Sequence, residues 1–243
     1  MFLKGINESI KLKILAVGLL SLLVAVIIIS VIAYNQAYSA LMKKAFNHIE
    51  SIEKIKKSRI KEYFKSRKDD LHTLSQTTHV AQLTAALIGY HKNNNLDSRG
   101  KYPINNATKA IFKPFEKFYT HYIDKKGYGY YDVFIICRRH GHVMYTKTKE
   151  SDIGANLSIG PLKTSGLGEL WKKVVTTKSY SIVDMKPYAP SNGEPAMFIG
   201  EPIYLNGSFE AVLAIQLNDK LLNSIMQERD GMGKTGETYL VGN

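Results

Sequence analysis

The side chains best suited to hold a small molecule in this sequence are a few phenols, carboxylates and one ammonium group in its second half. The segment HVMYTKT has the alternating pattern of a β-strand, and alternation predicts that Val143, Tyr145 and Lys147 share one face. Tyr145 and Lys147 would then form a phenol and ammonium pair suited to a carboxylate. The alternative interpretation makes Tyr145 a core residue and Lys147 a surface residue.

A second candidate group lies in VDMKPYAPS, where Asp184 ends an expected strand and Tyr188 follows between two prolines. A carboxylate followed by a proline-framed aromatic ring predicts a rigid rim over a ligand pocket. Asp132, in GYYDVF, is suited to a ligand amine or, alternatively, to capping a backbone turn where its strand begins. Phe198, in a later expected strand, is a further candidate that also fits a core position. The candidate ligand-binding residues are therefore Tyr145, Lys147, Asp184, Tyr188, Asp132 and Phe198.

Catalytic and metal-binding patterns find little support. Asp152, in KESDIGANL, precedes Gly154 and is expected to make local turn or N-cap hydrogen bonds. The seven histidines show no metal spacing with carboxylates, and His140 and His142, which flank Gly141, are interpreted as hairpin residues rather than as a metal pair. GMGKTGE does not match a phosphate-binding loop, and no G-x-S-x-G is present. The sequence therefore predicts a protein that is not an enzyme, with no metal site and no cofactor.

The net charge of +12 first suggests a nucleic-acid partner. A dense part of that charge lies in EKIKKSRIKEYFKSRKDD, residues 53–70, where lysines and arginines mix with apolar residues at helical spacing. This distribution predicts the solvated face of a long helix, with an anionic membrane or nucleic-acid surface as the alternative. We therefore expect no nucleic-acid partner. The single cysteine, Cys137, excludes an intrachain disulfide.

Residues 14–34 predict a transmembrane helix. The run ILAVGLLSLLVAVIIISVIA has no charge and no proline, and about 20 helical residues span the roughly 30 Å core of a bilayer. A cleavable signal peptide is the alternative, but its apolar region is only about 7–15 residues long. We expect an uncleaved anchor, with residues 1–13 as a short cytoplasmic tail and the chain after the anchor outside the inner membrane.

The elements that must position the candidate residues begin with a long helix. Residues 35–90 contain no proline, and their apolar residues recur at helical spacing, which predicts one continuous extracytoplasmic helix. The apolar stripe between Leu41 and Leu74 offers a helix–helix seam, so we expect a homodimer. Residues 91–129 predict a polar loop followed by a short helix that ends at Gly127.

Residues 130–230 predict a sheet. YYDVFIIC and HVMYTKT form an expected hairpin, and YSIVDM, AMFIGEPIY and FEAVLAIQL are three further expected strands. A loop-and-helix insert separates the hairpin from the other strands, and residues 218–229 predict a closing amphipathic helix. Five antiparallel strands with an insert across one face describe a PAS-like α+β sensor fold.

The hairpin YYDVFIICRRHGHVMYTKTKESDIGANL and the block VDMKPYAPSNGEPAMFIGEPIY, which follow an anchor and a long helix, resemble the extracytoplasmic Cache sensor domains of bacterial receptors. The segment GMGKTGETYLVG is similar to the join between the two modules of double-Cache methyl-accepting chemotaxis proteins. The resemblance implies that residues 231–243 hold this join and the first strand, TYLV, of a missing second module. It also implies that an Asp and a Tyr, from places comparable to Asp184 and Tyr188, hold a ligand ammonium.

The resemblance implies the ligand-sensing part of a bacterial transmembrane chemoreceptor, which binds a small molecule and signals across the membrane. The expected ligand is a carboxylate or an amino acid. The expected location is the inner (cell) membrane, with the sensor domain periplasmic or extracellular. Two alternatives stay open: the input domain of a sensor histidine kinase or nucleotide cyclase, and a membrane-tethered basic-helix protein without a signalling role.

Overall fold

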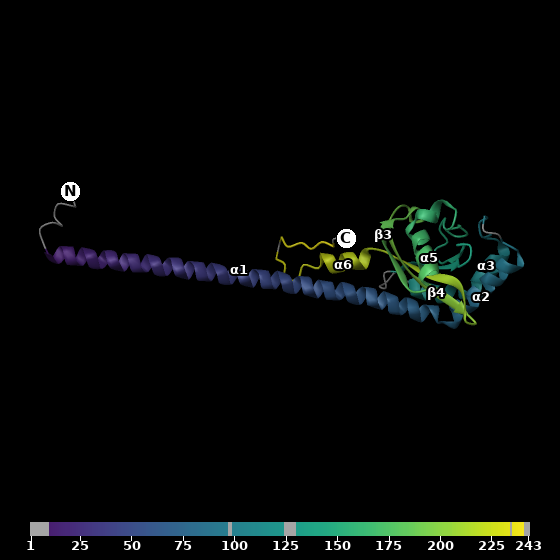
Figure 1. Ribbon diagram of the computed structural model, residues 1–243, viewed down its shortest axis with the longest axis horizontal. Coiled ribbons are helices and arrows are strands. Elements are labelled where there is room, and N and C mark those ends of the chain that lie inside the picture. Colours follow the sequence, from purple (N-terminus) through teal and green to yellow (C-terminus); the bar gives the residue numbers. More distant parts are fainter. Residues whose placement is uncertain (1–9, 97–98, 124–129, 234, 241–243) are drawn as a thin grey trace. The chain divides into compact units, whose positions relative to one another are not determined.

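The computed structural model describes residues 10–96, 99–123, 130–233 and 235–240 (Figure 1). It contains one very long helix, several short helices and a single five-stranded sheet. This content confirms the predicted α+β class.

Two compact units divide the chain. The first comprises Met1–Lys57 and Asp230–Gly236, and the second comprises Ser58–Arg229 and Glu237–Asn243. All of the candidate ligand-binding residues lie in the second unit, which we call the sheet unit.

The long helix expected over residues 35–90 is two helices. Helix α1 runs from Ile10 to Ser75, and α2 runs from Thr78 to Asn93. Thr77 caps the start of α2, because its hydroxyl accepts a hydrogen bond from the backbone N–H of Val80 at 3.3 Å. A threonine in this position competes with continued helix, so the predicted single helix is wrong at this break.

The predicted anchor, residues 14–34, lies within α1. By length and composition, α1 is the one helix of the described residues that is apolar enough to cross a membrane, although a signal sequence would meet the same criteria. Residues 1–9 of the expected cytoplasmic tail lie outside the described residues. The side chains of the predicted anchor are exposed, as expected if lipid surrounds this segment.

The sheet has the strand order β2-β1-β5-β4-β3, and all four pairings are antiparallel. Each strand coincides closely with a segment in which β-branched and aromatic residues were expected to pair. The strands are β1 (Tyr130–Cys137), β2 (Val143–Thr146), β3 (Ser181–Pro187), β4 (Pro195–Leu205) and β5 (Ser208–Leu217). The closing helix α6 follows at Lys220–Gln227.

The insert between β2 and β3 carries a short 3-10 turn, η3 (Pro161–Thr164), and helix α5 (Gly166–Thr177). Helix α5 packs on β3 and β4. Gly200 of β4 allows this close approach, because a Cβ there would lie 2.9 Å from Leu170 of α5. We call the side of the sheet under α5 the insert face.

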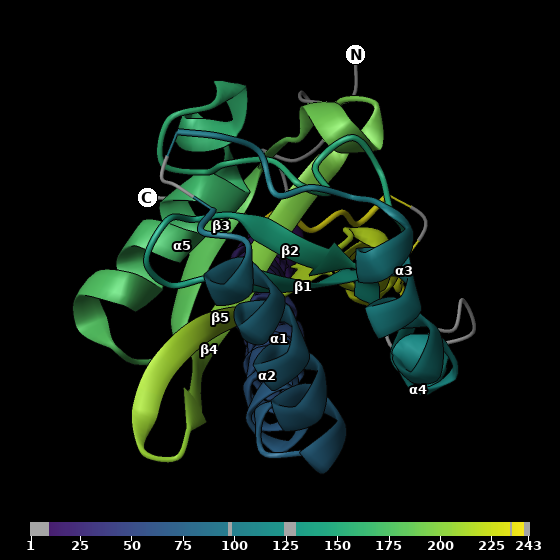
Figure 2. The ribbon, with the colours of Figure 1, turned by 90° about the vertical axis from the view of Figure 1, so that its right-hand side faces the viewer.

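The opposite side of the sheet, which we call the helix face, is covered by α2 and by α3 and α4 (Figure 2). Helix α3 spans Asn106–Phe112 and α4 spans Glu116–Ile123, with the 3-10 turn η2, Lys113–Phe115, between them. The single short helix expected here is therefore interrupted by a 3-10 turn at Pro114, which lacks the backbone N–H that helical bonding needs. The predicted end at Gly127 lies outside the described residues.

Each face has its own apolar core. Leu167, Leu170 and Trp171 of α5 pack on the insert face, whereas the helix face receives side chains from all four covering helices, α1 included. Each fully buried leucine contributes about 1.5–3 kcal/mol. The two cores hold the sheet between rigid layers and fix the side chains that lie near its edges.

The segment TYLV does not form a strand in its described residues. Thr238, Tyr239 and Leu240 have no regular secondary structure, and Val241 lies outside the described residues. The Thr238 hydroxyl instead donates to the backbone oxygen of Met226 at 2.8 Å. A strand needs a neighbouring strand to satisfy its backbone groups, and the described residues provide none for this segment.

Candidate functional site

A β-bulge changes the faces that were predicted for β2. Tyr145 pairs with Ile135 and Val143 pairs with Ile136, so Met144 is an extra residue between two consecutive partners. Val143 therefore joins the insert-face core, whereas Tyr145 joins the helix-face core. The prediction that Val143 and Tyr145 share a face is wrong, because a bulge shifts the two-residue alternation by one.

Tyr145 is fully buried between rings of the covering helices. Its ring lies 5.2 Å from that of Phe112 in α3 and 5.1 Å from that of Tyr119 in α4. Its hydroxyl has no hydrogen-bond partner in the described residues. Burial, followed by the nearby charge of Glu116, raises the pKa of this phenol.

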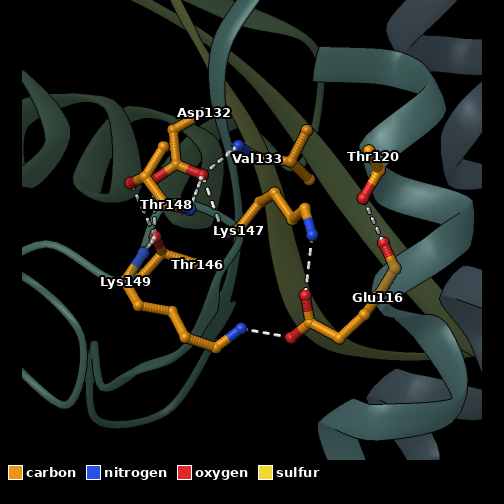
Figure 3. A network of polar contacts seen from close by, with 8 residues as sticks. All are labelled: Glu116, Thr120, Asp132, Val133, Thr146, Lys147, Thr148 and Lys149. Carbon is orange, nitrogen blue, oxygen red and sulfur yellow. Dashed lines mark hydrogen bonds and ion pairs between the residues drawn. The ribbon is translucent and has the colours of Figure 1, made fainter. Parts of the chain in front are cut away.

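Lys147 reaches the same helix face, as the alternation from Tyr145 predicts. Its ammonium lies 2.7 Å from one carboxylate oxygen of Glu116 in α4, and the ammonium of Lys149 contacts the other oxygen (Figure 3). Burial alone would raise the pKa of Glu116, but the hydrogen bonds from Lys147 and Lys149 outweigh it and lower the pKa. The ammonium of Lys147 thus already binds a carboxylate of the chain itself, and the Tyr145 hydroxyl does not take part.

Asp132 is a buried carboxylate with a complete set of donors (Figure 3). One of its oxygens accepts the backbone N–H groups of Val133, Lys147 and Thr148 at 2.7, 2.8 and 3.1 Å. The other accepts the hydroxyls of Thr146 and Thr148, both at 2.5 Å. Asp132 therefore ties the start of β1 to the turn after β2, which agrees with the capping alternative rather than with amine binding.

Asp152 and Tyr188 form a buried pair at the insert face. The Tyr188 hydroxyl donates to one oxygen of Asp152 at 2.8 Å, and the other oxygen of Asp152 has no hydrogen-bond partner in the described residues. Burial is the largest cause that raises the pKa of Asp152 to about 7, and the like charges of Asp132 and Glu150 add to it. Burial and Asp152 also raise the pKa of Tyr188.

A chain of polar contacts continues from this pair. Glu150 accepts hydrogen bonds from Tyr131 at 2.5 Å and from Ser191 at 2.8 Å. Ser191 in turn accepts from the side-chain amide of Gln216 at 3.0 Å, and the amide oxygen of Gln216 is buried without a partner. The backbone N–H of Ser191 donates to the backbone oxygen of Tyr188 at 3.1 Å, and Asp132 adds a nearby like charge. We call this group the acidic cluster, which consists of Asp132, Glu150, Asp152, Tyr188, Ser191 and Gln216.

The acidic cluster is electrostatically unbalanced. Its three carboxylates form no ion pair with a lysine, arginine or histidine within the described part of the chain. Two buried acceptors, on Asp152 and Gln216, lack a donor. Because unpaired buried acceptors and like charges both cost free energy, this arrangement is suited to a cationic N–H donor such as an ammonium group.

The predicted rim pair, Asp184 and Tyr188, is separated in the structure. Asp184 is exposed and its carboxylate accepts the backbone N–H of its neighbour Met185 at 2.7 Å, whereas Tyr188 is buried against Phe198, with ring centroids 4.9 Å apart. Phe198 belongs to the insert-face core. The acid that meets Tyr188 is Asp152, which sequence reasoning treated as a turn residue.

A signal for Asp152 is present in the sequence. Glu150 and Asp152 are two acids directly after an expected strand, at the start of the segment that crosses the sheet. Acids that lie side by side on a buried insert raise each other's pKa, which is a recurrent property of binding sites. The local turn pattern hid this possibility, because an Asp before a Gly is also the ordinary sequence of a turn.

Three histidines come together elsewhere in the sheet unit, which sequence reasoning missed. His91, from the last turn of α2, meets His140 and His142 from the turn between β1 and β2. Burial, followed by the charges of His142 and His140, lowers the pKa of His91 to about 4. His91 and His140 also line a cavity of about 480 Å³.

Comparisons with known proteins give similar solved structures only. No protein-family model matches the chain, and no curated protein matches its sequence. The sensor domain of the Vibrio cholerae histidine kinase DctB is 15% identical, with a TM-score of 0.49, and the match covers 79% of this chain and 61% of that one. The ligand-binding domain of the Pseudomonas aeruginosa PAO1 amino-acid chemoreceptor PctC, in complex with GABA, is 14% identical, with a TM-score of 0.48. That match covers 77% of this chain and 66% of the PctC chain.

The ligand-binding domain of the Campylobacter jejuni chemoreceptor Tlp3, in complex with 4-methylisoleucine, is 16% identical at a TM-score of 0.49, with 72% of this chain and 59% of that chain covered. The chain therefore spans less than two thirds of the length of each of these three structures. A similarity at this level transfers neither ligand nor signalling output to this chain.

Proposed function

We propose that this chain is the extracytoplasmic sensing part of a bacterial transmembrane chemoreceptor. Three features support the proposal: one helix apolar enough to anchor the chain, an antiparallel sheet with an insert across one face, and the sequence resemblance to Cache receptors. The anchor is residues 14–34, residues 1–13 are a short cytoplasmic tail, and the chain after the anchor lies outside the inner membrane. The resemblance of residues 231–243 to a join between modules favours a second module after them.

The ligand is a small molecule that carries an amine, and it binds at the acidic cluster. The observation that carries this choice is the buried Asp152 carboxylate, which has one oxygen bonded to Tyr188 and the other without a donor. An ammonium group would supply the missing donor and neutralise part of the charge shared with Glu150. A lone carboxylate would instead add a like charge, so of the two expected ligand classes the amino acid is favoured over the simple carboxylate.

Ligand binding would be linked to a structural change. Asp152, Tyr188 and Gln216 are all buried, so a ligand reaches them only when the segment that carries Tyr188 moves away from Asp152. A ligand that stabilises one arrangement of this segment shifts the population toward it. This is the two-state behaviour that a sensor requires.

The test is a binding measurement on the full chain in detergent. A panel of amino acids is titrated calorimetrically, each beside the carboxylic acid that lacks its amino group. We expect only the amine-bearing member of a pair to bind, and we expect Asp152→Asn to weaken it at least about 10-fold, since a charge-assisted bond of about 1.5–3 kcal/mol is lost.

The matched control is Asp184→Asn, which removes an equal charge from an exposed position of the same unit. It should change the affinity less than about twofold, because screening by solvent weakens exposed charges. Equal binding of the two members of a pair, or equal effects of Asp152→Asn and Asp184→Asn, would remove the acidic cluster from the ligand site.

A homodimer remains part of the proposal, with a narrower seam than the sequence suggested. Leu71 and Leu74 are buried in the core of the sheet unit, whereas Leu41, Ile49 and Ile55 are exposed. The stripe open to a second copy is therefore residues 41–55. Cysteine in place of Leu41 should cross-link two copies in membranes, and cysteine in place of Lys43, on the opposite side of the helix, should not; the reverse pattern would exclude this seam.

A further inference from the structure

Three ring nitrogens converge between α2 and the β1–β2 turn. Nε2 of His91 lies 2.9 Å from Nδ1 of His142 and 3.2 Å from Nδ1 of His140. A set of potential ligand atoms, one from each ring, lies within 4.8 Å of one another. Zn–N bonds of about 2.0–2.1 Å at tetrahedral angles place nitrogens about 3.3 Å apart, which is close to these separations.

The backbone of the turn holds the two later histidines in place. Gly141, between them, has φ of +72°, and a Cβ there would lie 3.1 Å from the Trp171 ring and 3.2 Å from the backbone nitrogen of Ser158. Glycine is favoured under both constraints. The chain is thus fixed so that His140 and His142 both meet His91.

A neighbouring carbonyl favours one tautomer of the His142 ring. Nε2 of His142 lies 2.9 Å from the backbone oxygen of Gly100, and a carbonyl oxygen can only accept. The side-chain amide nitrogen of Asn156 lies 3.2 Å from both this Nε2 and the Gly100 oxygen. The shorter contact, from Nε2 to the carbonyl, favours a neutral ring with its proton on Nε2 and the Nδ1 lone pair toward His91. Metal-binding histidines commonly donate their second N–H to a backbone carbonyl in this way.

A metal ion can bind all three imidazoles, whereas a proton cannot be bonded to all three at once. A single proton on Nε2 of His91 would have to be shared between His140 and His142, whereas a cation accepts a lone pair from all three rings at once. Three imidazoles are a ligand set for Zn²⁺ and for the neighbouring dications Co²⁺, Ni²⁺ and Cu²⁺.

We propose that His91, His140 and His142 form a transition-metal site that takes Zn²⁺ or a similar dication, separate from the amine site proposed above. The cavity of about 480 Å³ beside His91 and His140 gives access from solvent and room for a fourth ligand. Arg138 and Arg139 also line that cavity, so an anion is favoured over a neutral fourth ligand. A bound ion would join the end of α2 to the β1–β2 turn.

The test uses the full chain in detergent, purified with a tag that lacks histidine and stripped of metal with a chelator. Zn²⁺ is titrated in competition with a chromogenic chelator. We expect one ion per chain, and His142→Ala should weaken binding more than about 100-fold, since even indirect partners of a metal site cost about 10–100-fold. His140→Ala, at a half-buried position where loss of the fold is not expected, should also weaken Zn²⁺ binding substantially.

The matched control is His72→Ala, which removes an exposed histidine from α1 of the same unit and should leave Zn²⁺ affinity within twofold. Co²⁺ supplies an independent readout, because its visible absorption increases strongly in a four-coordinate site and should be lost in His140→Ala. Far-UV circular dichroism checks that each variant is folded. Equal Zn²⁺ affinity in the wild type and in folded His140→Ala, or an equal loss in His72→Ala, would overturn the proposal.

Discussion

Carboxylates on the two faces of the sheet have opposite electrostatic surroundings. On the helix face, Glu116 meets two lysines, and its pKa is lowered. On the insert face, Asp152 meets a phenol and two other acids, and its pKa is raised to about 7. The Glu116 carboxylate therefore has its positive partners, whereas the Asp152 carboxylate has none within the described residues.

This difference indicates which face can gain from a ligand. A carboxylate that already has its cations, like Glu116, offers little free energy to an added group, whereas an unpaired acceptor releases its desolvation cost when a donor arrives. Aromatic packing closes the helix face further, since Tyr145 lies between Phe112 and Tyr119. Binding is therefore expected at the insert face, although sequence reasoning placed Tyr145 and Lys147 in the site.

The largest effect on stability is expected from Asp132→Ala. This variant tests whether Asp132, unlike Asp152, has a structural role in the protein without ligand. This carboxylate accepts five hydrogen bonds, and its removal leaves buried N–H and hydroxyl donors without an acceptor. We expect the free energy of unfolding to fall by about 4 kcal/mol. Urea unfolding followed by the fluorescence of Trp171 measures it. A loss below about 1 kcal/mol would show that Asp132 is not structural.

The next effect is a pH dependence of stability, which comes from Asp152 on the insert face. The pKa of Asp152 is about 7 in the folded protein against 3.8 for an ordinary Asp, so the folded state holds its proton more tightly than the unfolded state. This contribution to stability is greatest below about pH 4, is lost as the pH rises to about 7, and amounts to on the order of 4 kcal/mol.

Urea unfolding at a series of pH values checks this prediction. Asp152→Asn removes this contribution, so the difference in stability between wild type and variant should decline between about pH 4 and 7, whatever His91 and other groups add to both profiles. The control Asp184→Asn should keep the wild-type profile. If the difference between wild type and Asp152→Asn rises with pH over this range instead, the Asp152 carboxylate is stabilised in its ionised form and the contrast between the two faces fails.

The smallest effects come from two phenols, one on each face. Tyr145→Phe removes a buried hydroxyl that has no partner in the described residues, so stability should stay within about 0.5 kcal/mol or increase. Tyr188→Phe removes the donor to Asp152 and should cost about 1–2 kcal/mol. Urea midpoints of the two variants measure the difference. Equal costs would mean that the hydroxyl of Tyr145 also has a partner.

Much of the architecture follows from local patterns. The apolar run of residues 14–34, the five strands and the insert could be predicted because side-chain periodicity and turn residues act over a few neighbouring positions. The helix break at Thr77 also has a local cause, its capping hydroxyl, and could have been found from the sequence.

The site was determined by tertiary structure alone. Tyr188 meets Asp152 across 36 positions of the chain, and His91 meets His140 and His142 across 49 and 51 positions. Such pairings depend on how the insert and α2 pack on the sheet, and no local period encodes that packing.

What the sequence by itself determined is therefore the class of fold, the candidate anchor and the supply of phenols, acids and histidines. Only the tertiary structure decided which of them meet. The bulge at Met144 moved Tyr145 to the opposite face from Val143, and the cation-rich helix face gave Lys147 its own carboxylate. The physical reason is that strand register and electrostatic balance are set by the whole packed unit, whereas propensity is a property of short segments.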